Sequence, residues 1–278
     1  MSQTFKGDVT NNVVELNLQA GATNIGSSSY RLGNTSNGEI LTVTKGDFPD
    51  YSYGSNPYYN DVNFKGLVIG TSCTSIGNNA FGFCSGLTGS LVIPDSVTSI
   101  GSSAFESCSS LTSLTLSSNL SYTTIEVTTF KNCTSMTGNL IIPSNVTTIE
   151  SAAFEYCSFT GNLNIPDTVT TIDTFCFRNN NFTSITIGSG LTAIPNGLMY
   201  LCASLTGTLV LPATTSSVGN NAFGGCAFTR IEYYRTSPPP TSVNPFAGGN
   251  NATEIHVPAA SSWVAGSTWN GLTVIKDL

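Results

Sequence analysis

Short apolar runs and polar turns alternate along the chain in one recurring order. Leucine or isoleucine stands at the first position of each run, and a second apolar residue follows two positions later. An alternation with a period of two predicts a β-strand whose apolar side chains share one face. The first position recurs every 22 to 26 residues, at Leu67, Leu91, Leu114, Leu140, Leu163, Ile185, Leu209, Ile231 and Ile255.

The residues between these strands follow a template as well. Proline often ends the strand, because it cannot donate to a sheet ladder. Two further apolar positions come next, and then a large ring at Phe81, Phe105, Phe130, Phe154, Phe177 and Phe223, with Met199 in one copy. One copy has too few apolar side chains to fold alone. The copies must therefore stack, so that each buries its two flat faces against its neighbours.

The pattern predicts a mainly β repeat solenoid. We expect a right-handed stack of leucine-rich-repeat coils with one parallel sheet and short irregular or 3₁₀ returns. Residues 1–63 form an N-terminal cap with a degenerate first repeat and a Tyr-rich insertion, 64–230 form about seven coils, and 231–278 form the terminal repeats and a C-terminal cap. In the cap, Leu16 and Leu18 match the two inward columns, which makes 31–63 the insertion. Trp263 and Trp269 are expected to close the last coil.

Composition narrows the function. Charged residues make up 9% of the chain, against roughly 25% in an average soluble domain. The net charge is -7 and no basic patch is visible, so nucleic acid is not an expected partner. No apolar run approaches the ~20 residues of a membrane span, and the N-terminus lacks the features of a signal peptide.

The recurring stretch "IPDSVTSIGSSAFESC", which begins at Ile93, resembles the BspA-like family of leucine-rich repeats, also called the Treponema pallidum type. The resemblance covers roughly residues 64–257. Members of this family are largely bacterial and protozoan surface proteins, and several are linked to adhesion to host proteins or to other cells. The resemblance therefore implies a solenoid fold and a place outside the cell.

The cysteines follow the repeat. Six of the eight lie three residues after the ring position, and Asn180 takes that position in one coil. Residues of one position stack about 4.8 Å apart in successive coils, so we expect a buried ladder of reduced thiols. Disulfides between coils are the alternative. Zinc is not expected, because there is one histidine and no CxxC motif, and no cofactor is expected.

Nothing in the sequence indicates an enzyme. His256 lies between the inward residues Ile255 and Val257, so we expect it on the surface of the last strand. No nucleophile elbow of the GxSxG type occurs. The few acidic pairs occupy variable surface positions rather than a cleft.

Two regions are candidate binding surfaces. One is an outward column of the sheet, which contains Val92, Thr115, Ile141, Asn164, Thr186 and Val210. This column is flat and neutral, which suits a binding surface. The alternative is that it is an ordinary solvated sheet face. The other is the Tyr-rich insertion, with Tyr51, Tyr53, Tyr58 and Tyr59. Tyrosines make good contact residues, and the alternative is that these rings fold back and seal the N-terminal end of the solenoid.

These observations lead to a non-enzymatic protein on an extracellular surface, which uses a rigid solenoid for recognition or adhesion. Its expected partners are a host protein or a surface glycan, without membrane insertion. The alternatives are a structural, decoration or receptor-binding protein of a phage-like virion, with a viral structural protein as partner, and a spacer without a ligand. Assembly through the terminal caps is a further expectation.

Overall fold

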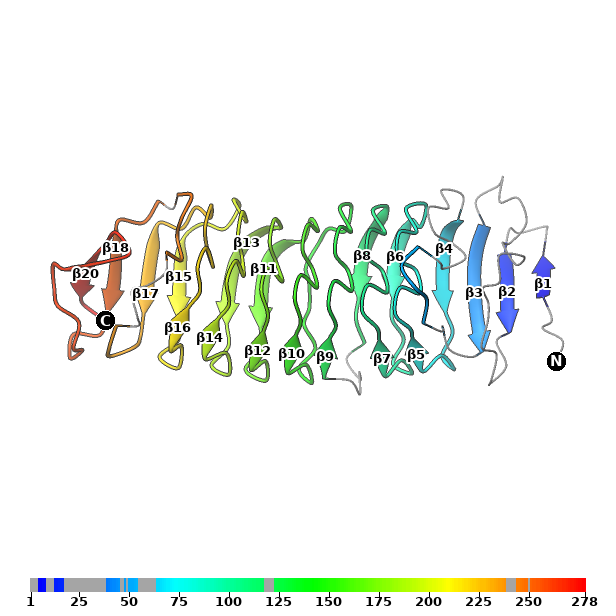
Figure 1. The fold of residues 1–278 in the computed structure, drawn as a ribbon, viewed down its shortest axis with the longest axis horizontal. Helices are drawn as coiled ribbons and strands as arrows, with labels where there is room; N and C mark the ends of the chain where they lie inside the picture. Colours follow the sequence, from blue (N-terminus) through cyan, green and yellow to red (C-terminus); the bar gives the residue numbers. More distant parts are fainter. Residues whose placement is uncertain are drawn as a thin grey trace.

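The computed structural model describes residues 5–8, 13–17, 39–45, 48, 50–54, 64–117, 123–238, 244–249 and 251–278. The chain forms an elongated solenoid in which the coils follow one another along the long axis (Figure 1). This confirms the predicted fold class. The longer strands are β1 (Phe5–Asp8), β2 (Val13–Asn17), β3 (Glu39–Lys45), β4 (Phe64–Ile69), β6 (Gly89–Val92), β8 (Leu111–Thr115), β11 (Thr160–Ile165), β13 (Asn181–Ile187), β15 (Thr208–Leu211), β17 (Arg230–Tyr233), β18 (Glu254–Val257) and β20 (Leu272–Lys276).

The longer strands pair in parallel, with the predicted inward positions side by side. Leu163 of β11 lies opposite Ile185 of β13, and Ile231 of β17 lies opposite Ile255 of β18. Because the side chains alternate, the columns that neighbour these inward residues point to solvent. Among the described strands, the antiparallel pairs are at the two ends, where β1 meets β2 and β19 (Thr268–Trp269) meets β20.

The predicted register of the N-terminal repeat was wrong by two residues. Leu16 lies opposite Val43, which lies opposite Ile69, so Leu16 belongs to the second inward column and Val14 to the first. Leu18 lies outside the described residues. The sequence did not reveal this shift for two reasons. Gly26 and Tyr30 match the template in the predicted register, and the strand has no proline to mark its end.

The predicted insertion also contains a coil. Strand β3 pairs in parallel with both β2 and β4, and Phe48 then bridges Ile76 of the next coil. Its sequence, "EILTVTK", keeps the period of two but lacks the proline and the ring-cysteine signature that identify the other coils. At the other end, β20 adds a strand beyond Ile255, with Val274 in the inward column.

The returns differ from the prediction as well. They contain turns but no 3₁₀ helix in the described residues, and a second row of two-residue strands runs beside the first. A Thr, Ser or Ala followed by a buried Ile or Val stacks from coil to coil here. The strands of this row are β5 (Ser75–Ile76), β7 (Ser99–Ile100), β9 (Thr124–Ile125), β10 (Thr148–Ile149), β12 (Thr171–Ile172), β14 (Ala193–Ile194) and β16 (Ser217–Val218).

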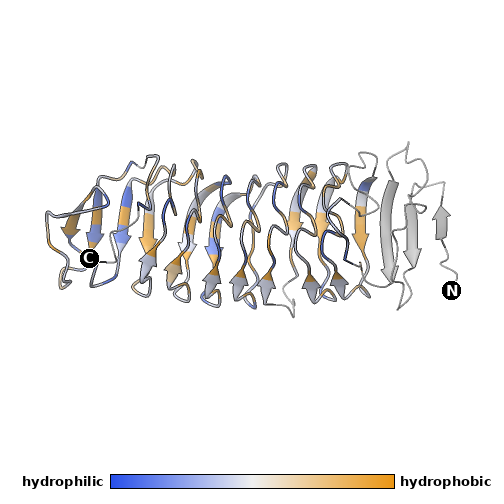
Figure 2. Cartoon of the chain, viewed as in Figure 1, coloured by the Kyte–Doolittle hydropathy of each residue, from blue (hydrophilic) through white to orange (hydrophobic). Residues whose placement is uncertain are grey.

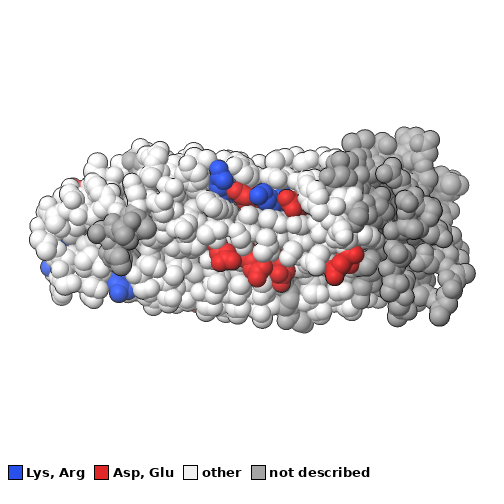
Figure 3. Space-filling model, viewed as in Figure 1, with Lys and Arg blue, Asp and Glu red and all other residues white. Residues whose placement is uncertain are grey.

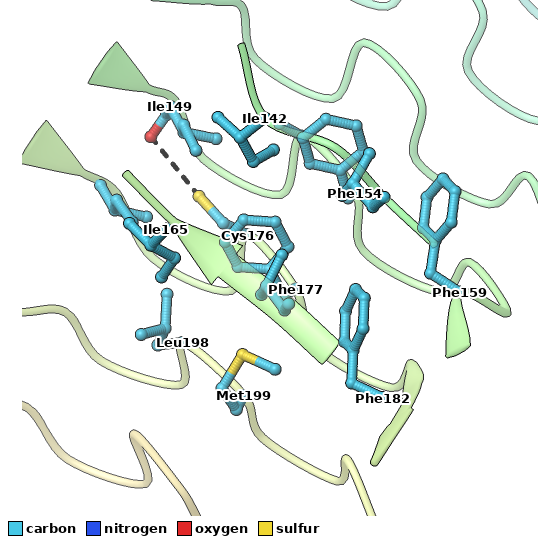
Figure 4. Packing of buried hydrophobic residues seen from close by; sticks show 14 of the residues in the cluster. Ile142, Ile149, Phe154, Phe159, Ile165, Cys176, Phe177, Phe182, Leu198 and Met199 are labelled. Carbon is cyan, nitrogen blue, oxygen red and sulfur yellow. Dashed lines mark hydrogen bonds between the residues drawn. The ribbon is translucent and has the colours of Figure 1, made fainter. Parts of the chain in front are cut away.

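The core is a column of stacked rings. Phe81, Phe105, Phe130, Phe154 and Phe177 follow one another with centroids 5.3 to 5.7 Å apart and nearly parallel planes. Phe159 and Phe182 form a second stack beside it, and Met199 takes the next ring position (Figure 4). All of these side chains are buried, so the stack ties each coil to the next.

The cysteine ladder lies beside the rings. All eight cysteines are buried free thiols. Five thiols of the repeat position each donate to the backbone carbonyl of the residue at the ring position one coil earlier: Cys108, Cys133, Cys157, Cys202 and Cys226. Cys108 donates to Phe81 O and Cys133 to Phe105 O, at 3.1 and 3.2 Å. Burial raises the pKa of both thiols well above the ordinary value. Asn180 replaces the thiol with its amide, which donates to Phe154 O at 2.8 Å.

Candidate functional site

The predicted outward column forms one exposed line along the sheet. Val92 lies opposite Thr115, Ile141 opposite Asn164, and Asn164 opposite Thr186. All six residues of the column are exposed, and its apolar members are the most prominent, with exposed fractions of 54% for Val92, 76% for Ile141 and 41% for Val210. The backbone ladder holds these side chains at fixed spacing, so the face is a rigid surface.

The sequence reasoning missed one member of this column. Val68 precedes Val92 in the same outward position and is 49% exposed. It follows the inward Leu67 by one residue, so the alternation of the strand could have identified it. With Val68, the exposed β-branched side chains extend from β4 to β15.

The neighbouring outward column bonds mainly to itself. The Ser113 hydroxyl donates to Ser90 Oγ at 2.7 Å, and the Ser184 hydroxyl donates to Asn162 Oδ1 at 3.0 Å. From Ser90 to Val210, neither outward column contains a charged residue. The face therefore offers apolar contacts and neutral hydrogen-bonding groups, and no ionic recognition in that stretch.

The tyrosines of the N-terminal segment are in different environments. Tyr51 is half-buried against the core, and burial raises its pKa to about 12. Tyr53 is 67% exposed, and its ring lies edge-on to Phe83 at 4.9 Å. Phe48 is buried and packs against Phe81. Tyr58 and Tyr59 lie outside the described residues.

The charged end of the sheet is a closed hydrogen-bonded network, visible as a polar stretch on β17 and β18 (Figure 2). Arg230 Nη1 lies 3.0 Å from His256 Nε2, and His256 Nδ1 lies 2.9 Å from Asp277 Oδ1. Arginine only donates, so Nε2 accepts and Nδ1–H donates to Asp277. Because both ring nitrogens are engaged, the imidazole cannot act as a base towards a nucleophile. His256 is also buried rather than on the surface, since Arg230 and Asp277 cover it.

A ladder of alternating charge runs along another face, a feature that the sequence reasoning missed. Glu155 is buried and pairs with Lys131 at 2.8 Å and with Arg178 at 3.2 Å. Arg178 also lies over the rings of Tyr156 and Tyr200. Figure 3 shows a row of mixed charge on this side, and beside it a row that contains only acids. The signal was present in the sequence, because these residues recur at one position of the repeat.

Two further arrangements were sought in the described part of the chain. No three His, Cys, Asp or Glu side chains there are grouped so that they could hold a metal ion. The same residues form no helix with the length and hydrophobicity needed to cross a membrane.

The comparisons with known proteins agree with the geometry. The model of the BspA type leucine rich repeat region matches six copies, over residues 52–138 and 123–238. No curated protein matches the chain in sequence.

Solved structures are similar to the chain, and two of them share its fold with TM-scores above 0.5. A leucine-rich repeat protein from Bacteroides ovatus is 16% identical, with a TM-score of 0.58 over 94% of this chain and 76% of that one. The pneumococcal vaccine antigen PcpA is 15% identical, with a TM-score of 0.51 over 86% of this chain and 71% of that one. A leucine rich cell surface protein from Faecalibacterium prausnitzii is 20% identical, with a TM-score of 0.46 over 99% and 95%.

Proposed function

The chain belongs to the BspA type leucine rich repeat family, and from that premise we propose that it is a non-enzymatic recognition protein displayed outside the cell. The observation that carries the proposal is the outward column of the sheet. Four aliphatic side chains on it are 41% to 76% exposed, although the core below is closed: Val68, Val92, Ile141 and Val210. A partner that covers these groups removes their apolar surface from water, which favours binding.

The partner that suits this face is neutral. Between Ser90 and Val210 the two outward columns contain small hydroxyl, amide and aliphatic groups, which can contact an uncharged protein surface or a glycan. Covering a side chain as exposed as Ile141 contributes about 1 to 2 kcal/mol to binding. Because the backbone ladder is rigid, this face loses little conformational entropy when a partner binds.

The non-enzymatic part of the proposal rests on the arrangement of polar groups. The one histidine has both ring nitrogens engaged. The cysteine thiols of the ladder lie in the core, where burial raises the pKa of Cys108, Cys133, Cys202 and Cys226. Between Ser90 and Val210 the two outward columns contain no carboxylate. A virion component and a ligand-free spacer stay alternative predictions, and no observation favours either of them over recognition.

The test is a binding screen followed by two variants. The purified chain is applied to an array of glycans and of immobilised extracellular-matrix and plasma proteins. Val92→Glu and Ile141→Glu are expected to weaken any binding found by about tenfold each, because a carboxylate must then be desolvated in the interface. The matched control is Val264→Glu, since Val264 is 68% exposed and lies outside the sheet column. Equal binding by all three variants would exclude the sheet face as the recognition surface.

A further inference from the structure

A groove crosses the second row of strands near the N-terminal half of the solenoid. It has a volume of about 650 Å³ and lies over β5 and β7, with Asp50 at one end and Glu126 at the other. Gly77 and Gly101 are among the residues that line it. The same position of the following coils is filled by Glu126, Glu150 and Asp173.

The repeat fixes the length of the groove. Asp50, Asn78, Ser102 and Val127 occupy one position in four successive coils. Asn78 N donates to Asp50 Oδ1, Ser102 N donates to Asn78 Oδ1, and Ser103 N donates to Val127 O. Coils of a parallel ladder lie about 4.8 Å apart, so three steps separate the two acidic ends by about 14 Å. Asp50 is held in place because its Oδ1 accepts from Asn78 N at 2.6 Å.

The charge of the groove is unbalanced. Among the described residues, no ion pair involves Asp50, Glu126 or Glu150. Burial and the neighbouring Glu150 raise the pKa of Glu126, so the second carboxylate repels the first. The mixed ladder provides the contrast, because there Lys131 and Arg178 neutralise Glu155. A positively charged group bound in the groove would neutralise its carboxylates, as Lys131 and Arg178 neutralise Glu155.

We propose that this groove binds an extended basic segment of a partner protein, in which two Lys or Arg side chains four residues apart contact Asp50 and Glu126. An extended chain rises about 3.4 Å per residue, so four residues span about 14 Å. Residues i and i+4 of such a chain also point to the same side, which places both bases in the groove. The hydroxyls of Ser75 and Ser99 lie between them for polar contacts. The site is separate from the outward column of the sheet.

The test uses the purified full chain and two acetylated, amidated peptides of equal composition. Ser-Lys-Thr-Ser-Thr-Lys-Ser has its lysines four residues apart, and Ser-Lys-Thr-Ser-Lys-Thr-Ser has them three apart. Titrations followed by NMR at low salt extend to about 1 mM peptide, the range of weak complexes. The first peptide is expected to bind about threefold more tightly than the second, and its affinity should fall as salt screens the charges.

Variants locate the site. Asp50→Asn keeps the acceptor for Asn78 N and removes the charge, and Glu126→Gln does the same at the other end. Each is expected to weaken the first peptide about threefold, and the two together about tenfold. Ser99→Trp fills the groove without a change of charge and should abolish binding. Asp167→Asn is the matched control with unchanged affinity, because Asp167 also accepts from a backbone N–H of the next coil, that of Ser189, at 2.6 Å.

Each contrary outcome overturns the proposal. No binding at about 1 mM, equal binding of both peptides, or equal binding by Asp50→Asn and Asp167→Asn would each do so. Calcium chloride alone producing the same spectral changes would show a cation site instead. Val92→Glu and Ile141→Glu should leave peptide binding unchanged, so the outcome is independent of recognition by the sheet face.

Discussion

Replacement of Gly101 by alanine should destabilise the protein more than replacements at the same position of the next coil. A Cβ atom at residue 101 would lie 2.5 Å from Asn78 Oδ1, 2.6 Å from Asn78 N and 2.9 Å from Asn78 Cα. Two of these atoms belong to the backbone, which cannot rotate away. The carboxamide is fixed as well, because Asn78 Oδ1 accepts from Ser102 N at 2.7 Å.

The cause is a coupling between successive coils. Gly219 repeats the arrangement, since Asn196 Oδ1 accepts from Asn220 N at 2.7 Å and occupies the space beside Gly219. Where the preceding coil has Ser102, Val127 or Ser151 at the asparagine position, the glycine position contains Glu126, Glu150 or Asp173. At these two positions the asparagine of one coil occupies the space that a Cβ atom in the next coil would need.

The magnitude follows from two contributions. Overpacking a close contact costs about 1 to 3 kcal/mol, and disturbing the Asn78–Ser102 hydrogen bond costs about 1 kcal/mol more. We expect Gly101→Ala to lower the free energy of unfolding by about 2 to 4 kcal/mol. Asn78→Ser alone should cost about 1 kcal/mol, and it should recover at least that amount when combined with Gly101→Ala, because the clash with the amide is gone.

The assay is urea unfolding at 25 °C, followed by circular dichroism and by the fluorescence of Trp263 and Trp269. Coincidence of the two transitions shows that the coils unfold as one unit. Glu126→Ala is the matched control, one coil along at the same position, and it should not lower the free energy of unfolding as Gly101→Ala does. A Gly101→Ala variant within about 0.5 kcal/mol of the wild type, or strict additivity with Asn78→Ser, would refute the coupling.

Three further substitutions test other parts of the structure. Leu201 has a φ of 62° and is exposed, and Asn132 and Asn179 occupy the same position, so Leu201→Asn should stabilise the chain by about 0.5 to 1 kcal/mol in urea unfolding. Cys133→Val leaves the Phe105 carbonyl without its Sγ donor and should cost about 1 to 3 kcal/mol, while Cys133→Ser should cost less because it retains a donor. The raised pKa of Glu126 means that the folded state holds this proton more tightly. Stability from this group is therefore present below the unfolded pKa and lost as pH rises through the folded pKa. Glu126→Gln should melt at a higher temperature than the wild type at pH 7 and at the same temperature near pH 3.

The parts of the fold that repeat could be predicted from the sequence. The inward leucines, the ring column and the cysteine position recur in enough copies for one register to be recognised. The strand around Leu16 appears once, in a segment without the proline or ring signature, and its register was misread by two residues. A shift of two keeps the same side chains inward, so the apolar pattern alone could not detect it.

The candidate site, like the fold, could be predicted from the sequence only in part. Strand alternation was sufficient to predict that Val92, Ile141 and Val210 are exposed. It did not predict that His256 is buried, because the Asp277 carboxylate that covers it comes from β20, a strand that was not recognised. The groove also depends on the order of the coils, since its lining residues Asp50, Gly77, Gly101 and Glu126 come from four successive coils.

The central claim is display of this solenoid outside the cell, and surface labelling tests it most directly. Intact cells that make the protein are treated with a membrane-impermeant, amine-reactive biotin reagent, and the peptides that contain Lys65, an exposed residue, are quantified by mass spectrometry before and after lysis. The account predicts labelling on intact cells, to an extent similar to that after lysis. Labelling of Lys65 only after lysis, beside labelled surface proteins of the same cells, would contradict it.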